Sequence, residues 1–92
     1  MRVSSLGTAA SGSQVINVAG QTRALIIGVS PVEGARCLLG IYSTSGGTVY
    51  VNQYDKGSYL TITAATGTVT IANSNSNGVL LYGLSFSGEL SI

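Results

Sequence analysis

Histidine and tryptophan are absent from this sequence of 92 residues, and cysteine and proline occur once each. Without histidine, neither a His-dependent acid–base pair nor a Cys/His zinc site can form, and one cysteine cannot make a disulfide within a chain. Charge is scarce as well, since 8% of the residues are charged and the net charge is +1. This balance supplies no basic field for nucleic acid and no acidic field for cations. The sequence therefore predicts a protein that is not an enzyme, uses no metal or cofactor and binds no nucleic acid.

Long apolar runs are also missing. The longest, at residues 24–29, is far shorter than the roughly 18 residues of a membrane-spanning helix, so we expect no membrane insertion. Residues 1–7 lack the apolar core of about 7–15 residues that a Sec signal peptide needs, so no such peptide is expected. Met1 is either the natural start or the first residue of a piece cut from a longer protein, and the sequence fits both.

What the sequence does contain is the pattern of β-strands. Hydrophobic residues make up 45% of the chain. Residues 48–54 alternate, with Val49 and Val51 on one face and polar or tyrosine side chains on the other, whereas no window of ten residues has a helical period. Turn signals recur about every 8–12 residues, which is typical of small all-β domains. We therefore predict an all-β fold: a small antiparallel β-sandwich or jelly roll of seven to eight short strands within residues 13–92.

The expected strands are 13–18, 23–30, 35–44, 48–54, 59–64, 68–72 and 79–87, with 89–92 as a further edge strand. The run from residue 24 is almost continuously apolar, which predicts a strand that is covered on both faces. Residues 1–12, in contrast, are small and polar without a period. They predict a flexible N-terminal arm, which is either a frayed terminus or a docking peptide.

The size of the chain predicts association with further copies. A chain this short buries only about 60–70% of its unfolded surface, and it has no disulfide or metal to add stability. The scarcity of charge indicates that surface normally exposed to water is covered by a partner copy. We therefore expect a homo-oligomer.

The candidate binding residues lie around the turn at residues 55–57. They are Tyr50, Asn52, Tyr54, Asp55 and Tyr59. Aromatic rings beside amides and a carboxylate suit sugar recognition, because the ring stacks on C–H faces while the polar groups bond to hydroxyls. The alternative is that these rings pack across strands or in a subunit interface, where tyrosine is enriched.

Two other features favour structural interpretations. Cys37 lies in an apolar alternating strand, which favours a small buried hydrophobe over a nucleophile. The loop at residues 73–78 offers side-chain amide oxygens, but it lacks the carboxylates that Ca²⁺ sites usually contain, so an Asn/Ser turn is favoured over a calcium site.

The Gly/Ser/Thr/Asn-rich composition and motifs such as Gly67-Thr68-Val69-Thr70-Ile71-Ala72-Asn73 carry a resemblance. Residues 13–92 resemble small β-sandwich domains of bacteriophage virions, as in tail-fibre tips, head fibres and decoration proteins. The resemblance implies a homotrimer that attaches to a capsid, a tail part or a host-surface glycan, at the virion or another extracellular surface. The resemblance assigns no binding-site residue to this chain.

Two functions from different classes follow. The first is a non-enzymatic structural or adhesive module, virion-associated and trimeric, that assembles through apolar strand faces. The alternative is a monomeric carbohydrate-binding module of a bacterial surface or secreted protein, with the tyrosines as its binding surface. An enzyme and a fibre-forming protein with open strand edges are further alternatives.

Overall fold

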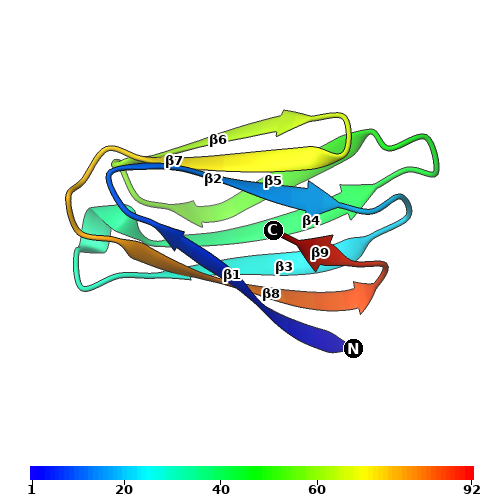
Figure 1. The fold of residues 1–92 in the computed structure, drawn as a ribbon, viewed down its shortest axis with the longest axis horizontal. Helices are drawn as coiled ribbons and strands as arrows, with labels where there is room; N and C mark the ends of the chain where they lie inside the picture. Colours follow the sequence, from blue (N-terminus) through cyan, green and yellow to red (C-terminus); the bar gives the residue numbers. More distant parts are fainter.

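Two antiparallel β-sheets pack face to face in the computed structural model, which describes all residues from 1 to 92. The strands are β1 (Arg2–Ala9), β2 (Gly12–Val18), β3 (Arg23–Val29), β4 (Cys37–Ser43), β5 (Val49–Lys56), β6 (Leu60–Ala65), β7 (Thr68–Asn73), β8 (Val79–Ser87) and β9 (Leu90–Ser91). The larger sheet has the order β1-β8-β3-β4-β5, and the smaller sheet has the order β6-β7-β2-β9 (Figure 1). This arrangement confirms the predicted small antiparallel β-sandwich.

The core lies between the two sheets and is built from side chains that alternate along each strand. On β4, Cys37, Leu39 and Ile41 are buried, and on β7 the buried apolar residues are Val69 and Ile71. In both strands the buried residues lie on one side, as the two-residue period of a strand requires. The buried hydrophobic residues form one continuous cluster of 17, as expected of a single domain with one core.

Residues 2–9 form an edge strand of the larger sheet, which corrects the expectation of a flexible arm through Gly12. β1 pairs antiparallel with β8 and buries both Leu6 and Ala9. The register shifts at a bulge around Gly7, whose φ is 79°. A bulge with glycine in the left-handed region interrupts the two-residue period, and the small residues around it show no apolar alternation. The sandwich therefore has nine strands instead of seven to eight.

Strand β3 is covered on one face only. Ala24 and Ile26 point into the core, whereas Ile27 and Val29 are 37% and 51% exposed on the opposite face. The expectation that both faces are covered is therefore not met within a single chain. The apolar outer side of β3 remains accessible to a partner.

A close backbone contact fixes the crossover from β5 to β6, where the chain passes from the larger sheet to the smaller. The N–H of Gly57 donates to Arg36 O at 2.8 Å, and the N–H of Tyr59 donates to Gly34 O at 2.9 Å. The backbone of Gly34 lies so close to Gly57 that no side chain fits there. The 3-10 turn at Glu33–Ala35 and the crossover therefore hold each other in place.

Candidate functional site

The outer face of the larger sheet carries most of the exposed hydrophobic side chains of the protein. The register sets outward residues of neighbouring strands side by side: Ile27 of β3 lies opposite Tyr82 of β8 and Leu38 of β4. We call this surface the apolar face; its residues are Val3, Leu25, Ile27, Val29, Leu38, Tyr42, Tyr50, Tyr54, Leu80, Tyr82, Leu84 and Phe86. All of these except Leu25 and Leu84 are at least 36% exposed, so the face holds ten of the fourteen exposed large hydrophobic residues.

Three of the aromatic rings on the apolar face, those of Tyr42, Tyr50 and Tyr54, pack against other groups of the protein. Tyr42 and Tyr50 stack across β4 and β5, with ring centroids 4.7 Å apart and planes inclined by 14°. The guanidinium of Arg23 lies 5.2 Å from the centroid of the Tyr42 ring and donates to two backbone carbonyls. The ring of Tyr54 covers Gly40, where a Cβ atom would come within 2.7 Å of a ring carbon. A partner that contacts these three rings therefore meets preorganised side chains, which lowers the entropy lost on binding.

A groove of about 240 Å³ crosses the end of the apolar face. Arg23, Tyr42, Asn52, Tyr54 and Phe86 are among its lining residues. It thus combines three aromatic rings with one guanidinium and one amide. Its volume is just below the roughly 300–1,000 Å³ of sites for drug-sized ligands, so it suits a single small ring.

The structure brings three of the five predicted binding residues together and separates the other two. Tyr50, Asn52 and Tyr54 follow one another along the outer side of β5, and the last two line the groove. Asp55 pairs with a neighbouring arginine at the end of the strand. Tyr59 lies beyond the crossover, next to the smaller sheet.

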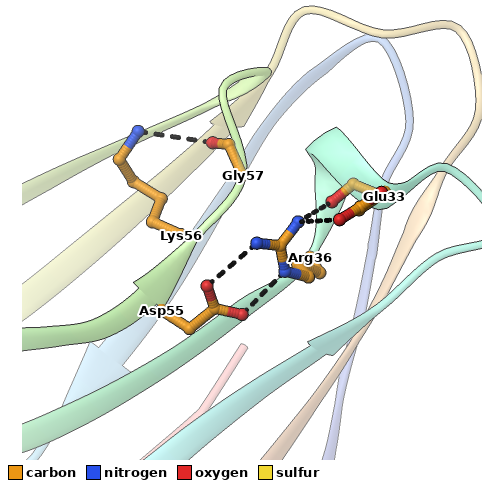
Figure 2. A network of polar contacts seen from close by, with 5 residues as sticks. All are labelled: Glu33, Arg36, Asp55, Lys56 and Gly57. Atoms are coloured by element: carbon orange, nitrogen blue, oxygen red, sulfur yellow. Dashed lines mark hydrogen bonds and ion pairs between the residues drawn. The ribbon is translucent and has the colours of Figure 1, made fainter.

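The carboxylate of Asp55 is occupied by Arg36, as Figure 2 shows. Arg36 Nε donates to Asp55 Oδ2 at 2.8 Å, and Nη2 donates to Oδ1 at 3.1 Å. Arg36 Nη1 also donates to the carbonyl oxygen of Glu33 and lies 3.7 Å from its carboxylate. The hydrogen bond and the negative charge of Asp55 raise the pKa of Arg36. Asp55 therefore holds the 3-10 turn against β5, and it is not among the residues that line the groove.

The outer face of the smaller sheet has a different character. Its outward residues include Thr61 and Thr63 on β6, Thr70 on β7 and Asn17 on β2. Val15 is the one large apolar residue among them. The two outer faces of the sandwich are therefore unequal: one is apolar and aromatic, and the other is rich in hydroxyl groups.

The remaining reactive or ligating groups are used within the fold. Cys37 is buried, and this burial raises the pKa of its thiol to about 11, so the thiol stays protonated at neutral pH. In the 73–78 loop, Asn73 Oδ1 accepts from the N–H of Asn75, and Asn75 Oδ1 accepts from the N–H of Asn77. These contacts make the loop an Asn/Ser turn. No helix in the protein has the length and apolarity required of a membrane span.

The aliphatic part of the apolar face was not predicted from the sequence. The alternation does set Leu80, Tyr82, Leu84 and Phe86 on one side of β8, but Val79 and Leu81 on the other side are apolar too. The pattern of one strand therefore does not reveal which side the second sheet covers.

No protein-family model, curated protein or solved structure matches the chain.

Proposed function

We propose that this protein is a non-enzymatic structural or adhesive module that assembles as a homo-oligomer through the apolar face. The observation that carries the proposal is the concentration of exposed hydrophobic residues on one face of one sheet. The partner that fits this face best is a second copy of the chain, because the face is hydrophobic and nearly uncharged.

The area of the face supports this assignment. Its ten exposed residues are on average about half exposed. With ~150–250 Å² for a large side chain, they leave on the order of 900 Å² accessible to solvent. The largest apolar patch on a monomer is typically about 300–600 Å², whereas each partner in a standard interface buries about 800 Å². The apolar face is therefore too large for an ordinary monomer surface and large enough for a stable interface.

The apolar face carries few charged side chains at its edges. Arg23 lies against Tyr42, and the Arg36–Asp55 ion pair neutralises itself at the corner near β4 and β5. Burial of the face therefore removes one charge without an ion-pair partner, that of Arg23, whose guanidinium keeps its hydrogen bonds to two backbone carbonyls. A trimer follows if three copies turn this face toward a common threefold axis, since a heterologous interface that closes makes a ring. The resemblance to phage virion sandwiches favours such a trimer, attached to a capsid, a tail or a host surface.

The test is the absolute mass in solution by light scattering, with a matched pair of variants. Leu80 on the apolar face and Val15 on the smaller sheet are almost equally exposed, at 47% and 48%. We expect a wild-type mass of three times 9.3 kDa, a folded monomer for Leu80→Asp and an unchanged trimer for Val15→Asp. A monomeric wild type at every concentration refutes the proposal, and a dimer refutes the trimer while retaining the interface.

The second candidate, a monomeric carbohydrate-binding module, is favoured by the groove at Asn52 and Tyr54. In the assembled form this groove is covered, so the two functions exclude each other. For a monomeric wild type, the candidate predicts that Tyr54→Ala abolishes glycan binding while the far-ultraviolet circular dichroism stays unchanged. Unchanged binding by this variant rules out the groove as the sugar site.

A further inference from the structure

The smaller sheet has a groove of its own, at the end where β2 and β6 begin and β7 ends. The register aligns Ser13 of β2, Ala72 of β7 and Thr61 of β6 in one row across three strands. Ala72 forms a low floor between the two hydroxyl-bearing residues, which are two strand spacings or about 10 Å apart. Tyr59 and Ser11 line the same groove, which measures about 300 Å³.

The ring of Tyr59 is a fixed wall of this groove. It packs on Gly34, where a Cβ atom would come within 2.6 Å of ring carbon Cδ2. The Tyr59 N–H donates to Gly34 O at 2.9 Å, and its carbonyl accepts from the N–H of Ser74 at 3.0 Å. The residue nevertheless remains 41% exposed. The groove thus offers a flat aromatic surface whose position is set before a ligand arrives.

Three hydroxyl groups of the groove are free to bind, whereas the Ser74 hydroxyl donates to Tyr59 O at 3.3 Å. The hydroxyls of Ser11, Ser13 and Thr61 make no hydrogen bond within the protein, whereas the amide of Asn73, which also lines the groove, is used by the loops. Ser11 is one of two non-glycine residues with positive φ, at 52°. This left-handed conformation forms the tight turn between β1 and β2. No charged side chain lines the groove.

We propose that this groove binds a neutral saccharide. The C–H face of one sugar ring lies against Tyr59, and its hydroxyls exchange hydrogen bonds with Ser11, Ser13 and Thr61. A charged ligand finds no counter-ion here, and a purely apolar ligand leaves the hydroxyls without partners. The groove belongs to the sheet opposite the apolar face, so it stays open when that face is covered. The inference therefore does not depend on the proposed assembly.

The experiment is a titration of the full-length ¹⁵N-labelled chain with methyl glycosides of glucose, galactose, mannose and N-acetylglucosamine, followed by amide chemical shifts. We expect at least one glycoside to shift amides around Tyr59 and Thr61. Methyl glucuronide serves as the anionic comparison. The proposal is overturned if no glycoside shifts these amides, if the shifts map to the Tyr54 groove instead, or if the glucuronide binds more tightly than every neutral glycoside.

Two matched pairs of variants test the contacts without removing the aromatic ring from the fold. Thr61→Val deletes one hydroxyl, and we expect it to raise the dissociation constant about threefold to tenfold. Thr63→Val deletes the corresponding hydroxyl one row away and should change nothing. Ala72→Ile fills the floor and should abolish binding, whereas Ala65→Ile, on the same face of β6, should not. If the two variants of either pair bind the glycoside with equal dissociation constants, the saccharide does not bind in this groove.

Discussion

Asn73 joins the two loops at one end of the sandwich, and its replacement by alanine tests how much these contacts stabilise the fold. The side-chain Nδ2 donates to Ala9 O at 2.8 Å and to Asn77 O at 2.9 Å, while Oδ1 accepts from the N–H of Asn75 at 3.0 Å. Asn73 is only 3% exposed. One side chain therefore connects the turn after β1 to the loop between β7 and β8.

The expected loss follows from these three hydrogen bonds. Each contributes about 1 kcal/mol on average. In the variant, water can replace the lost partners of Asn75 and Asn77 because those groups are near the surface. The hydrogen bond to Ala9 O is buried, so water does not compensate for its loss. We expect Asn73→Ala to lower the free energy of unfolding by about 2–3 kcal/mol. For a domain of this size, that corresponds to a decrease in Tm of roughly 10–20 °C.

The assay is urea and thermal unfolding followed by circular dichroism, at one fixed protein concentration because the Tm of an oligomer depends on concentration. Asn75→Ala is the control, since the Asn75 side chain makes its hydrogen bonds in the exposed part of the same loop. It should lose less than about 1 kcal/mol. If Asn73→Ala is as stable as the wild type, or if the two variants lose the same amount, these buried contacts do not hold the loops.

Three further predictions concern the core and the backbone. Leu6→Ala should lower the free energy of unfolding by about 2–5 kcal/mol; wild-type stability would show that β1 behaves as an arm. Because burial raises the pKa of Cys37 from 9.0 to about 11, folding favours the neutral thiol. This contribution is therefore complete below pH 9 and is lost toward pH 11, so Cys37→Ala should flatten the fall in stability measured over this range. Gly67 has a φ of 74° and open space around it, so Gly67→Ala should lower the free energy of unfolding by about 1–2 kcal/mol through backbone strain. Gly57→Ala should lower the free energy of unfolding further, because the new methyl group collides with the backbone of Gly34. Equal decreases for the two glycine variants in urea titrations would contradict that close approach.

The fold class could be predicted because the side-chain period of a strand is local. Val69 and Ile71 alternate with threonine in the sequence and are buried in the structure. The same two-residue period placed Tyr50, Asn52 and Tyr54 on one side of β5, since residues i, i+2 and i+4 of a strand share a face. This part of the candidate site required no knowledge of strand order.

Other positions required the tertiary structure. Asp55 and Tyr59 are close to Tyr54 in the sequence, so all three were predicted to lie in one site. In the structure, however, the carboxylate of Asp55 binds Arg36, which lies nineteen residues earlier in the chain. The crossover at Gly57 then carries Tyr59 to the smaller sheet. The contacts that decide both placements join residues far apart in the chain, so no local pattern contains them.

The formation of strands, most of their positions and the alternation of their side chains depend on neighbouring residues, so they could be predicted from the sequence. The side of each apolar strand that is buried depends on how the two sheets pack. Strands β3 and β8 are apolar on both sides, and the smaller sheet covers one side of each strand. The order of strands and the packing of the two sheets leave Ile27, Tyr82 and their neighbours at the surface. The apolar face is thus a property of the assembled sheets and of no single strand.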